Sequence, residues 1–452
     1  MRLWGGRFRK EPDSMLKEFT YSLSYDIRLA EYDIRGSMAW AKMLAREGIL
    51  TRREGERILK ALKRIGKEIR DEGAKFRDAE DIHTAIEERL EELVGEMALK
   101  LRAGRSRNDQ VVTDLRLYLK EKSAVIIKRI ESLQKSLVKA ARRHLDTVMP
   151  GLTHLQPAQP VLFSHHLLAY HCMLQRDKDR FKECLKRTDI LPLGSAALSG
   201  TSIPVDRRFL ARELGFSCLS ENSIDAVGDR DFVLEFLSHS AIMVIHLSRL
   251  AEEFILWASP GFGFIEIDET FCTGSSMMPQ KKNPDVLELI RARTGRIAGH
   301  FVALGIVLKG LPLAYNRDLQ EDKEGVFDTV EVLEKVLSIL PGILKSMKVN
   351  KERMRKHAET GFLNATDCAE YLVRKGIPFR KAHQILGRIV TYCLEKQKRL
   401  EDLTLNEFQY FSRLFDEDVY KYLSIEECIK SKDSMGSTSP KRVKKEIKKR
   451  EK

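Results

Sequence analysis

Apolar residues recur at intervals of three and four positions over most of the chain, and this spacing predicts helices that bury one face. The alternation of apolar and polar residues that marks strands is essentially absent. The pattern therefore predicts an all-α fold. Long helices are expected over residues 109–144, 160–187 and 229–259 and in the segment that starts at Pro284, with shorter ones over 37–49 and 51–69.

The segment 229–259 is apolar on nearly every face of the expected helix. Arg249, Glu252 and Glu253 interrupt it, which predicts a helix buried in protein and not a membrane span. A helix that is apolar all round needs neighbours on every side. We therefore expect a bundle of long helices whose centre is completed by other copies of the chain, in a homo-oligomer of closed symmetry.

The texture of the sequence divides the chain into three parts. Residues 1–106 and 355–452 show short, charged helical patterns, whereas residues 107–354 hold the long helices. We expect an N-terminal helical domain, a central bundle domain that forms the oligomer core and carries most site loops, and a C-terminal helical domain with a basic tail. Polar loops are expected over 150–160, 191–206, 221–231, 274–285 and 311–323.

Composition and charge narrow the class of protein. The 452 residues begin without the apolar run of a signal peptide, and no segment has the roughly 20 uninterrupted apolar residues that cross a bilayer. The seven cysteines form no CxxC pair, which indicates reduced thiols that fill the core of a cytoplasmic protein. We therefore expect a cytoplasmic location and no membrane partner.

Much of the positive charge lies at the C-terminus. The net charge is +13, and the last thirteen residues hold eight basic and two acidic ones. The rest of the chain is only mildly basic, which fits an anionic small substrate. An RNA-binding tail is the alternative, but a frayed, solvated helix end explains the tail better, and nucleic-acid binding is not expected.

A polar loop, GSSMMPQKKNPD at 274–285, precedes one of the long helices. Pro284 suits the first helical position and Asn283 the cap before it. The free backbone amides, the helix dipole, Lys281 and Lys282 would all favour an anion there. The alternative is that Asn283 only caps the helix and that the lysines are solvated.

The remaining chemistry points to proton transfer without a cofactor or a metal. The sequence has no glycine-rich nucleotide cradle after a strand, no HExxH and no convincing nucleophile triad. His165 and His166 are neighbours on one helix and point in different directions, as do His171 and Cys172, so a metal site is not expected. Hydroxyls, amides, histidines and cations suit the binding of a dicarboxylate and proton transfer at a carbon beside one carboxylate.

Such a proton transfer builds a doubly charged intermediate, so the site must gather cations and amide donors around the carboxylate. A serine of the 274–285 loop could accept the proton only if its alkoxide were stabilised by the lysine and the backbone amides. An acid is needed on the opposite side, and His154 in THLQ is the best candidate by residue type. The alternative for His154 is a ring satisfied by backbone bonds in a turn.

Several motifs carry a family resemblance. The loop GSSMMPQKKNPD resembles the signature loop of the fumarase/aspartase superfamily. WGGRF (4–8), GRSRNDQ (104–110), THLQ (153–156), NSIDAVGDRD (222–231) and AYNRDLQEDK (314–323) resemble the argininosuccinate lyase family in the same order, and SMGSTSPKRV extends the match near the C-terminus. LGSAALSGT, Leu152 and Pro157 depart slightly from the family pattern.

The resemblance implies a carbon–nitrogen lyase that splits argininosuccinate into L-arginine and fumarate by reversible β-elimination, in arginine biosynthesis. It also implies a fumarase/aspartase-like all-α homotetramer in which three subunits build each site. The catalytic residues implied are Ser275 as base, His154 as acid and Lys281 beside the carboxylate. The positions that match substrate-binding residues, or would lie in the same cleft, are Ser22, His83, Arg105, Asn108, Thr153, Asn283, Tyr315, Gln320 and Lys323.

Some questions stay open from the sequence. It does not settle which of Ser275 and His154 is the base and which the acid. Another fumarate-releasing lyase of the same superfamily is an alternative function. A non-catalytic, crystallin-like structural protein is a second alternative, although the intact Ser275, Lys281 and His154 argue against it.

Overall fold

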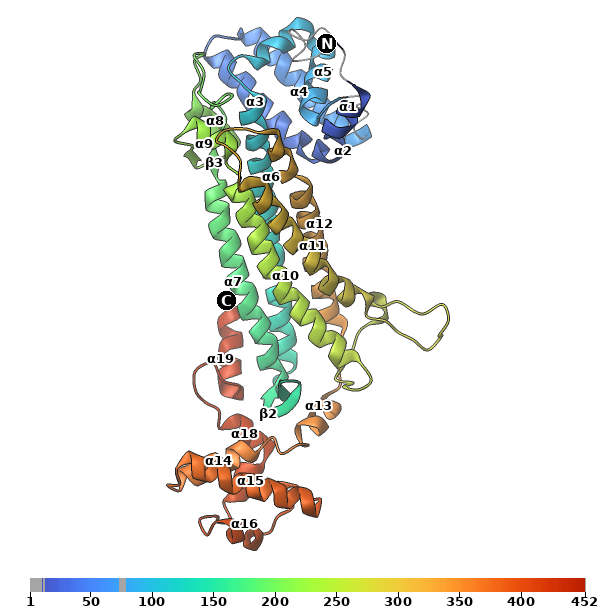
Figure 1. The fold of residues 1–452 in the computed structure, drawn as a ribbon, viewed down its shortest axis with the longest axis vertical. Coiled ribbons are helices and arrows are strands. Elements are labelled where there is room, and N and C mark those ends of the chain that lie inside the picture. The colour runs from blue at the N-terminus through green and yellow to red at the C-terminus, as the bar shows by residue number, and fades with distance from the viewer. Residues whose placement is uncertain (1–9, 11–12, 73–78, 452) are drawn as a thin grey trace. The chain divides into compact units, whose positions relative to one another are not determined.

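The computed structural model describes residue 10, residues 13–72 and residues 79–451. Helices make up most of these residues, so the predicted all-α fold class is confirmed (Figure 1). The WGGRF motif at 4–8 lies outside the described residues.

Five long helices dominate the described residues: α6 (Arg107–Arg143), α7 (Phe163–Thr188), α10 (Asp231–Ala258), α11 (Asp285–Leu308) and α12 (Glu324–Ser346). The first four lie within a few residues of their expected positions, whereas α12 was not predicted from the sequence. The expectation of a helix from residue 160 was wrong by three residues, because residues 160–162 belong to a strand. Shorter helices precede and follow the long ones. They are α1 (Ser14–Thr20), α2 (Leu23–Asp26), α3 (Ala30–Arg46), α4 (Arg52–Glu72), α5 (Ile82–Val94), α8 (Arg207–Leu214), α9 (Ser223–Gly228), α13 (Lys351–Ala358), α14 (Ala365–Arg374), α15 (Phe379–Lys396), α16 (Leu405–Phe411), α17 (Val419–Leu423), α18 (Ile425–Lys430) and α19 (Pro440–Arg450).

Three small sheets of two strands each join these helices. The antiparallel hairpin β1 (Val148–Thr153) and β2 (Gln156–Leu162) occupies the segment expected to be a loop. That expectation was wrong, because prolines are tolerated in a two-stranded ribbon, where both strands are edges. The other pairs are β3 (Ile190–Leu191) with β4 (Cys218–Leu219), and β5 (Ile265–Glu266) with β6 (Lys348–Val349).

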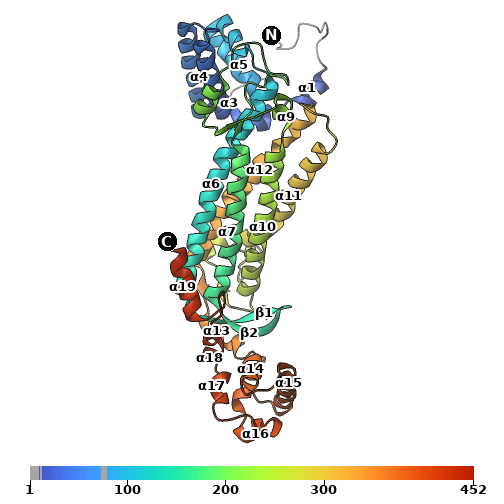
Figure 2. The ribbon, with the colours of Figure 1, turned by 90° about the vertical axis from the view of Figure 1, so that its left-hand side faces the viewer.

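Contacts divide the chain into two compact units. The first unit is Met1–Ile127, Asp179–Ile242 and Gly295–Glu334, and the second is Lys128–Lys178, Met243–Thr294 and Lys335–Lys452. In each unit, the portions of the five long helices that belong to it lie side by side (Figures 1 and 2). The division into domains at 1–106, 107–354 and 355–452 stays a prediction.

The C-terminal helices of the second unit have a hydrophobic cluster of their own. Tyr371 and Phe415 stack there with ring centroids 5.9 Å apart. The sequence suggested that the basic tail is a frayed helix end, and this expectation was wrong. The tail forms α19, which buries Val443 and Ile447, and its N-cap Ser439 accepts a hydrogen bond from the amide of Arg442. Two apolar side chains on one face are enough to anchor this highly charged helix.

Along the part of the chain that the structure describes, no helix has the length and apolar character that a bilayer span requires.

Candidate active site

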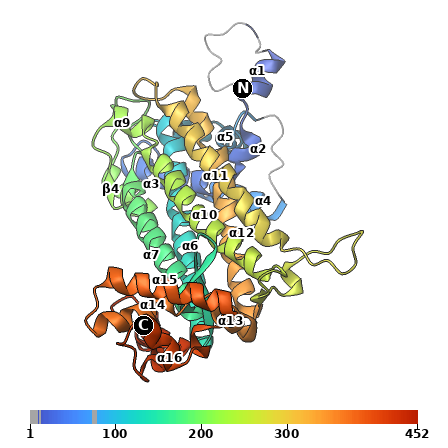
Figure 3. The ribbon, with the colours of Figure 1, turned by 60° about the horizontal axis from the view of Figure 1, so that its bottom comes forward.

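The serine loop, residues 274–282, is closed at its base in the second unit. Thr273 and Asn283 exchange two backbone hydrogen bonds, of 3.0 and 2.8 Å. The loop projects away from the helices between η4 (Glu269–Phe271) and α11 (Figures 1 and 3). Both of its ends are therefore fixed, while the residues between them are exposed or half-buried.

Ser275 is the residue of this loop whose side chain receives backbone amides. Its Oγ accepts hydrogen bonds from the amides of Met278, at 3.0 Å, and Met277, at 3.3 Å. Two amide donors aimed at one oxygen stabilise negative charge on it, as in an oxyanion hole. The sequence analysis required backbone amides and a lysine to stabilise a serine alkoxide, and these two hydrogen bonds supply the amides.

Lys281 and Asn283 flank the exposed end of the loop. The Lys281 amide donates to the carbonyl of Met278 at 3.1 Å, and its side chain is exposed. The Asn283 side-chain amide donates to the carbonyl of Gly274 at 3.4 Å. The expectation that Asn283 caps the helix was wrong by one residue. The helix starts at Asp285, and its first carbonyl acceptor is that of Pro284, because Asn283 is held in its bridge with Thr273.

Thr153 and His154 lie at the tip of the β1–β2 hairpin, also in the second unit. Thr153 pairs with Gln156, and the two residues between them, His154 and Leu155, have φ values of 55° and 58°. A two-residue turn with both residues left-handed matches the twist of a hairpin, although it strains residues other than glycine. His154 therefore lies at an exposed tip of the hairpin.

Gly151 allows the hairpin to form. A Cβ atom at this position would lie 2.9 Å from the carbonyl oxygen of Gln159 on the partner strand. The register also shifts between Gly151 and Leu152, which marks a bulge. The bulge sets the position of the tip that carries Thr153 and His154.

The serine loop and the hairpin tip do not meet within one copy of the chain. Among the described residues, no hydrogen bond or ion pair joins His154 to Ser275 or Lys281, and Figures 1 and 3 show the loop and the hairpin in separate places in the second unit. The contacts within one copy therefore do not join the serine loop to His154.

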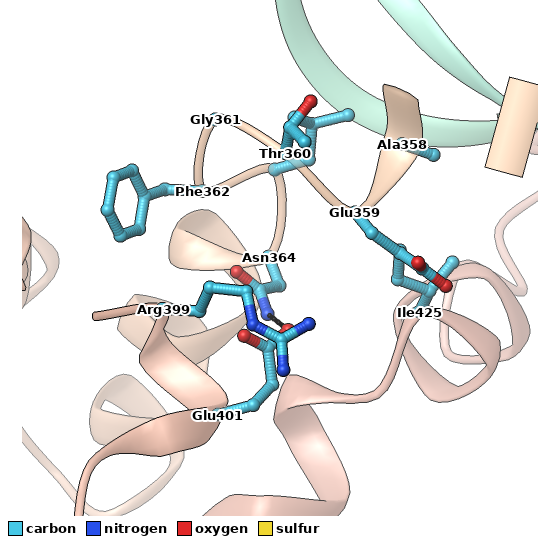
Figure 4. A pocket seen from close by; sticks show the side chains of 10 residues that line it. Ala358, Glu359, Thr360, Gly361, Phe362, Asn364, Arg399, Glu401 and Ile425 are labelled. Atoms are coloured by element: carbon cyan, nitrogen blue, oxygen red, sulfur yellow. Dashed lines mark hydrogen bonds between the residues drawn. The ribbon is translucent and has the colours of Figure 1, made fainter. Parts of the chain in front are cut away.

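A 200 Å³ cavity lies near the hairpin, at the start of the C-terminal helices (Figure 4). Asn364 beside it donates to Glu401, at 2.8 Å, and to the carbonyl of Leu423, at 2.9 Å. A Cβ at Gly361 would lie 3.8 Å from Pro157 of β2. Two polar groups of the lining, Asn364 and Glu401, bond each other. The cavity lies beside the hairpin, and its lining holds none of the predicted site residues.

The first unit brings together the other predicted positions, starting with Ser22. Its Oγ donates to Asp26 at 2.5 Å, and its amide donates to the carbonyl of Glu80 at 2.9 Å. Asp26 also accepts the amide of Ile82 at 3.1 Å. Burial raises the pKa of Asp26. Ser22 is thus fixed against the start of α5.

His83 is almost completely buried, at 1% exposure, so it is not a surface residue. Its Nδ1 lies 2.5 Å from Asp33 Oδ2, which also accepts Gln110 Nε2 at 2.6 Å. Burial alone would raise the pKa of Asp33, but the hydrogen bond and the charge of His83 outweigh it and lower this pKa to about 2. Burial, and then the charge of Asp33, raise the pKa of Asp114 well above its usual value.

Arg105 and Asn108 lie at the start of α6. Arg105 is buried and donates to Ser37 Oγ at 2.9 Å, with Glu87 3.9 Å from its Nη2. Asn108 Nδ2 donates to the carbonyl of Ala197 at 3.0 Å, which ties α6 to the loop 194–200. Asp109 holds the same loop, because its carboxylate accepts the amides of Gly194 and Ala196 at 2.9 and 2.8 Å.

Tyr315, Gln320 and Lys323 come from the segment that ends at α12. Gln320 Nε2 donates to the carbonyl of Thr20 at 3.2 Å. Burial raises the pKa of Tyr315. Lys323 is buried and donates to Asp322 at 2.7 Å, and Asp322 also accepts the fully buried Arg230.

Gly228 brings the 222–231 motif against this segment, since a Cβ there would lie 2.6 Å from the carbonyl oxygen of Ala314. The first unit therefore links four of the sequence motifs, at 104–110, 193–201, 222–231 and 314–323, through side chains and close backbone contacts. Ser22, His83, Arg105, Asn108, Tyr315, Gln320 and Lys323 all belong to this network, whereas Thr153, His154, Ser275, Lys281 and Asn283 belong to the second unit.

One group of described residues could hold a metal ion by its geometry, because its possible ligand atoms all lie within 4.8 Å of one another. It consists of Asp33, His83 and Asp114. Asp33 Oδ2 is already occupied by two hydrogen bonds, and the cations Arg105 and Arg107 act on both carboxyl groups. This arrangement suits a hydrogen-bonded support for His83 better than a cation site.

The sequence did not single out Asp33 or Asp114, and it showed Asp109 and Asp322 only as members of the motifs GRSRNDQ and AYNRDLQEDK. Each is a buried carboxyl group within a helical segment. An aspartate at a core-facing helical position is the one signal that could have found them, because such a residue is rarely buried without partners.

Comparisons with known proteins agree with these motifs. A family model described as Lyase matches residues 6–299, and one described as Argininosuccinate lyase C-terminal matches residues 362–430. The argininosuccinate lyase of Moorella thermoacetica is 52% identical over 448 residues, which cover 99% of this chain and 97% of that protein. That of Bacillus cereus is 51% identical over 449 residues, with the same coverage.

Solved structures show the same fold. EDDS lyase in complex with formate superposes with a TM-score of 0.85 at 29% identity, covering 94% of this chain and 86% of that one. The class II fumarase of Schistosoma mansoni gives a TM-score of 0.77 at 17% identity, covering 88% and 90% of the two chains, and so supports the fold alone. The chain is a lyase and belongs to the argininosuccinate lyase family of the fumarase/aspartase superfamily.

Proposed function

We propose that this chain splits argininosuccinate into L-arginine and fumarate, as the last step of arginine synthesis in the cytoplasm. The membership of the family supports the reaction, and the Ser275 hydroxyl, which accepts two backbone amides, is the observation that carries the mechanism. A general base, a general acid and fixed cations can perform this elimination, so the proposed mechanism uses no cofactor and no metal.

The first step is the removal of a proton from the succinate carbon next to a carboxylate. Ser275 is the proposed base, because the amides of Met277 and Met278 would stabilise its alkoxide. Negative charge then develops on the carboxylate, and Lys281 and Asn283 are the proposed groups that receive it.

The second step breaks the bond between that intermediate and the guanidinium nitrogen. His154, at the exposed hairpin tip beside Thr153, is the proposed acid that assists the leaving guanidinium. The proposed substrate-binding positions Ser22, Asn108, Tyr315, Gln320 and Lys323 have supporting contacts in the first unit. His83 and Arg105 are buried behind them and are proposed to hold this part of the site in place.

The proposed assembly is a homotetramer in which different subunits supply the serine loop, the hairpin and the first-unit motifs. The separation of the loop from the hairpin supports this assembly. Large apolar side chains exposed on α10 and α11 support it too, because burial of such side chains against another copy would be favourable. They are Ile245, Leu289, Val302 and Ile306.

A second candidate function is the cleavage of the substrate of EDDS lyase, which the TM-score of 0.85 favours. A direct assay separates the two. Fumarate absorbance would be followed for the wild type with argininosuccinate, EDDS, adenylosuccinate and aspartate. We expect release from argininosuccinate alone. Release from another substrate alone would refute the proposed function.

The role of Ser275 is tested in the same assay. We expect Ser275→Ala to lower kcat by about 10²- to 10⁴-fold, the usual contribution of a general base. Ser412→Ala is the matched control, because the Oγ of Ser412 also accepts a backbone amide, from Leu414, and lies outside the loop. Wild-type activity in Ser275→Ala would exclude this serine as the base.

A further inference from the structure

A cavity of about 580 Å³ lies in the second unit where α6, α7 and α19 meet. Figures 1 and 2 show α19 beside the other two helices. Its lining includes no residue of the serine loop or of the hairpin, and the proposed mechanism does not use it.

The lining of this cavity is strongly cationic. Lys135, Lys178, Lys449 and Arg450 contribute four positive charges. Glu131 is the carboxylate in the lining, and it lies 3.5 Å from Lys178. Glu446, outside the lining, pairs with Arg450, so four cations face two carboxylates. Lys135 and Lys449 are the lining cations that form no ion pair with a carboxylate among the described residues. The remaining positive charge makes the cavity attractive to an anion with more than one charge.

A thiol faces the same cavity. Arg450 Nη2 donates to Cys172 Sγ at 3.4 Å, while Arg450 Nε donates to His171 Nδ1 at 3.2 Å. Burial, and then the charges of Arg450 and Lys178, lower the pKa of His171 to about 4, so its ring is a neutral acceptor. The sequence argument that His171 and Cys172 point in different directions was wrong, because one guanidinium contacts both.

Cys172 therefore differs from the other cysteines. Cys184, Cys368, Cys393 and Cys428 are buried, as expected for core residues. Cys218 is exposed and Cys272 is half-buried, and no cationic side chain is hydrogen-bonded to either sulfur among the described residues. Cys172 combines access with a fixed cation at its sulfur.

We propose that this cavity binds fumarate, an unsaturated dicarboxylate, and that Cys172 is thereby modified by addition to its double bond. The inference rests on the proposed function, because it takes its ligand from the product of that reaction. The two carboxylates pair with the lysines and Arg450, and a four-carbon chain fits well within the volume. The cations thus hold the double bond beside the sulfur.

The addition balances without an oxidant or a reductant. The sulfur of the thiolate forms a bond to one alkene carbon, and the π electron pair moves to the other carbon, where the adjacent carboxylate shares the charge. That carbon then takes a proton from water. The product is a thioether that carries a succinate group. The extent of this modification at Cys172 of α7 would therefore increase with the fumarate concentration.

The test uses the purified full-length protein, fumarate added from outside and mildly alkaline buffer, in which cysteine thiols are partly ionised. Peptide mass spectrometry would compare the rates of adduct formation at Cys172 and Cys218. We expect Cys172 to react at least about tenfold faster, the lower end of electrostatic rate enhancement. With dimethyl fumarate, which has the same double bond and no charge, the preference should disappear.

Two further measurements separate electrostatic capture from simple exposure. Added salt should lower the preference of fumarate for Cys172 in the wild type. The double variant Lys135→Gln/Lys449→Gln should also lower the preference of fumarate for Cys172, without changing the reaction with the ester. Because both lysines are exposed, the fold should be retained. Equal labelling of Cys172 and Cys218 by fumarate, or the same preference with the ester, would overturn the proposal.

Failure of this proposal and failure of the proposed function are distinguishable. Because fumarate is supplied directly, labelling of Cys172 does not depend on the cleavage of argininosuccinate. A chain that cleaves argininosuccinate and shows no preference for Cys172 would refute only the cavity proposal.

Discussion

Asp33 accepts hydrogen bonds from three side chains at once, which makes it the centre of the buried polar cluster in the first unit. His83, Gln110 and Ser37 approach it at 2.5, 2.6 and 3.1 Å. Burial and the charge of Asp33 raise the pKa of its neighbour Asp114. The pKa values of two adjacent aspartates thus shift in opposite directions, because three donors surround one of them.

This difference predicts losses of stability of different size for the same substitution. Asp33→Asn should lower the free energy of unfolding by about 3 kcal/mol, because buried donors lose a charged acceptor. Asp114→Asn should cost less than about 1 kcal/mol, since an amide resembles the neutral acid in size and polarity. Urea unfolding of both variants measures the two values. Equal losses would contradict the opposite pKa shifts of the two aspartates.

The sequence showed the chemistry of Ser275, Lys281 and His154 but not that of Asp33 or Asp114. The former lie in local motifs, in which residue type and order carry the information. The latter depend on contacts with His83 and Gln110, which are 50 and 77 positions from Asp33. Spacing within one helix cannot reveal such partners.

At the level of elements, periodicity predicted the long helices well and the β1–β2 hairpin not at all. Pro150, Pro157 and Pro160 suggested a loop, but Pro150 and Pro160 lie opposite each other in a two-stranded ribbon that tolerates them. The two motifs at 222–231 and 314–323 were found in the sequence, but their close contact at Gly228 was not. Such a contact depends on the packing of elements that are distant in the chain.

Gly228→Ala tests this contact. The new Cβ would lie 2.6 Å from the Ala314 carbonyl, which must move and shift the segment that carries Tyr315 and Gln320. We expect KM for argininosuccinate to rise and stability to fall by about 2 kcal/mol. Gly310→Ala is the control, because a Cβ there meets no atom within 4 Å. A Gly228→Ala variant that behaves like this control would show that the contact is unimportant.

The start of α6 gives a prediction about pH. Burial raises the pKa of Asp109 from 3.8 to about 6, although the amides of Gly194, Ala196 and Ser106 oppose this. The folded state then holds a proton that the unfolded state releases, so stability falls as pH rises from about 4 to 6, by about 3 kcal/mol. The difference in unfolding free energy between the wild type and Asp109→Asn should shrink over this range. A difference that is independent of pH would contradict the raised pKa.

At the scale of the whole molecule, the proposed site residues fall into two units and three groups. The serine loop and the hairpin belong to the second unit and do not meet in one copy, and the remaining positions belong to the first unit. The apolar pattern of residues 229–259 predicted an oligomer. The resemblance, and not the pattern, implied which loops share a site.

The central claim is that Ser275 of one subunit and His154 of another act on the same argininosuccinate molecule. The most direct test mixes Ser275→Ala and His154→Asn chains, unfolds and refolds them together, and measures fumarate release. Random assortment in a closed oligomer should restore activity in about one quarter of the sites, namely those with both residues intact. A refolded mixture no more active than the two variants measured separately would contradict the claim.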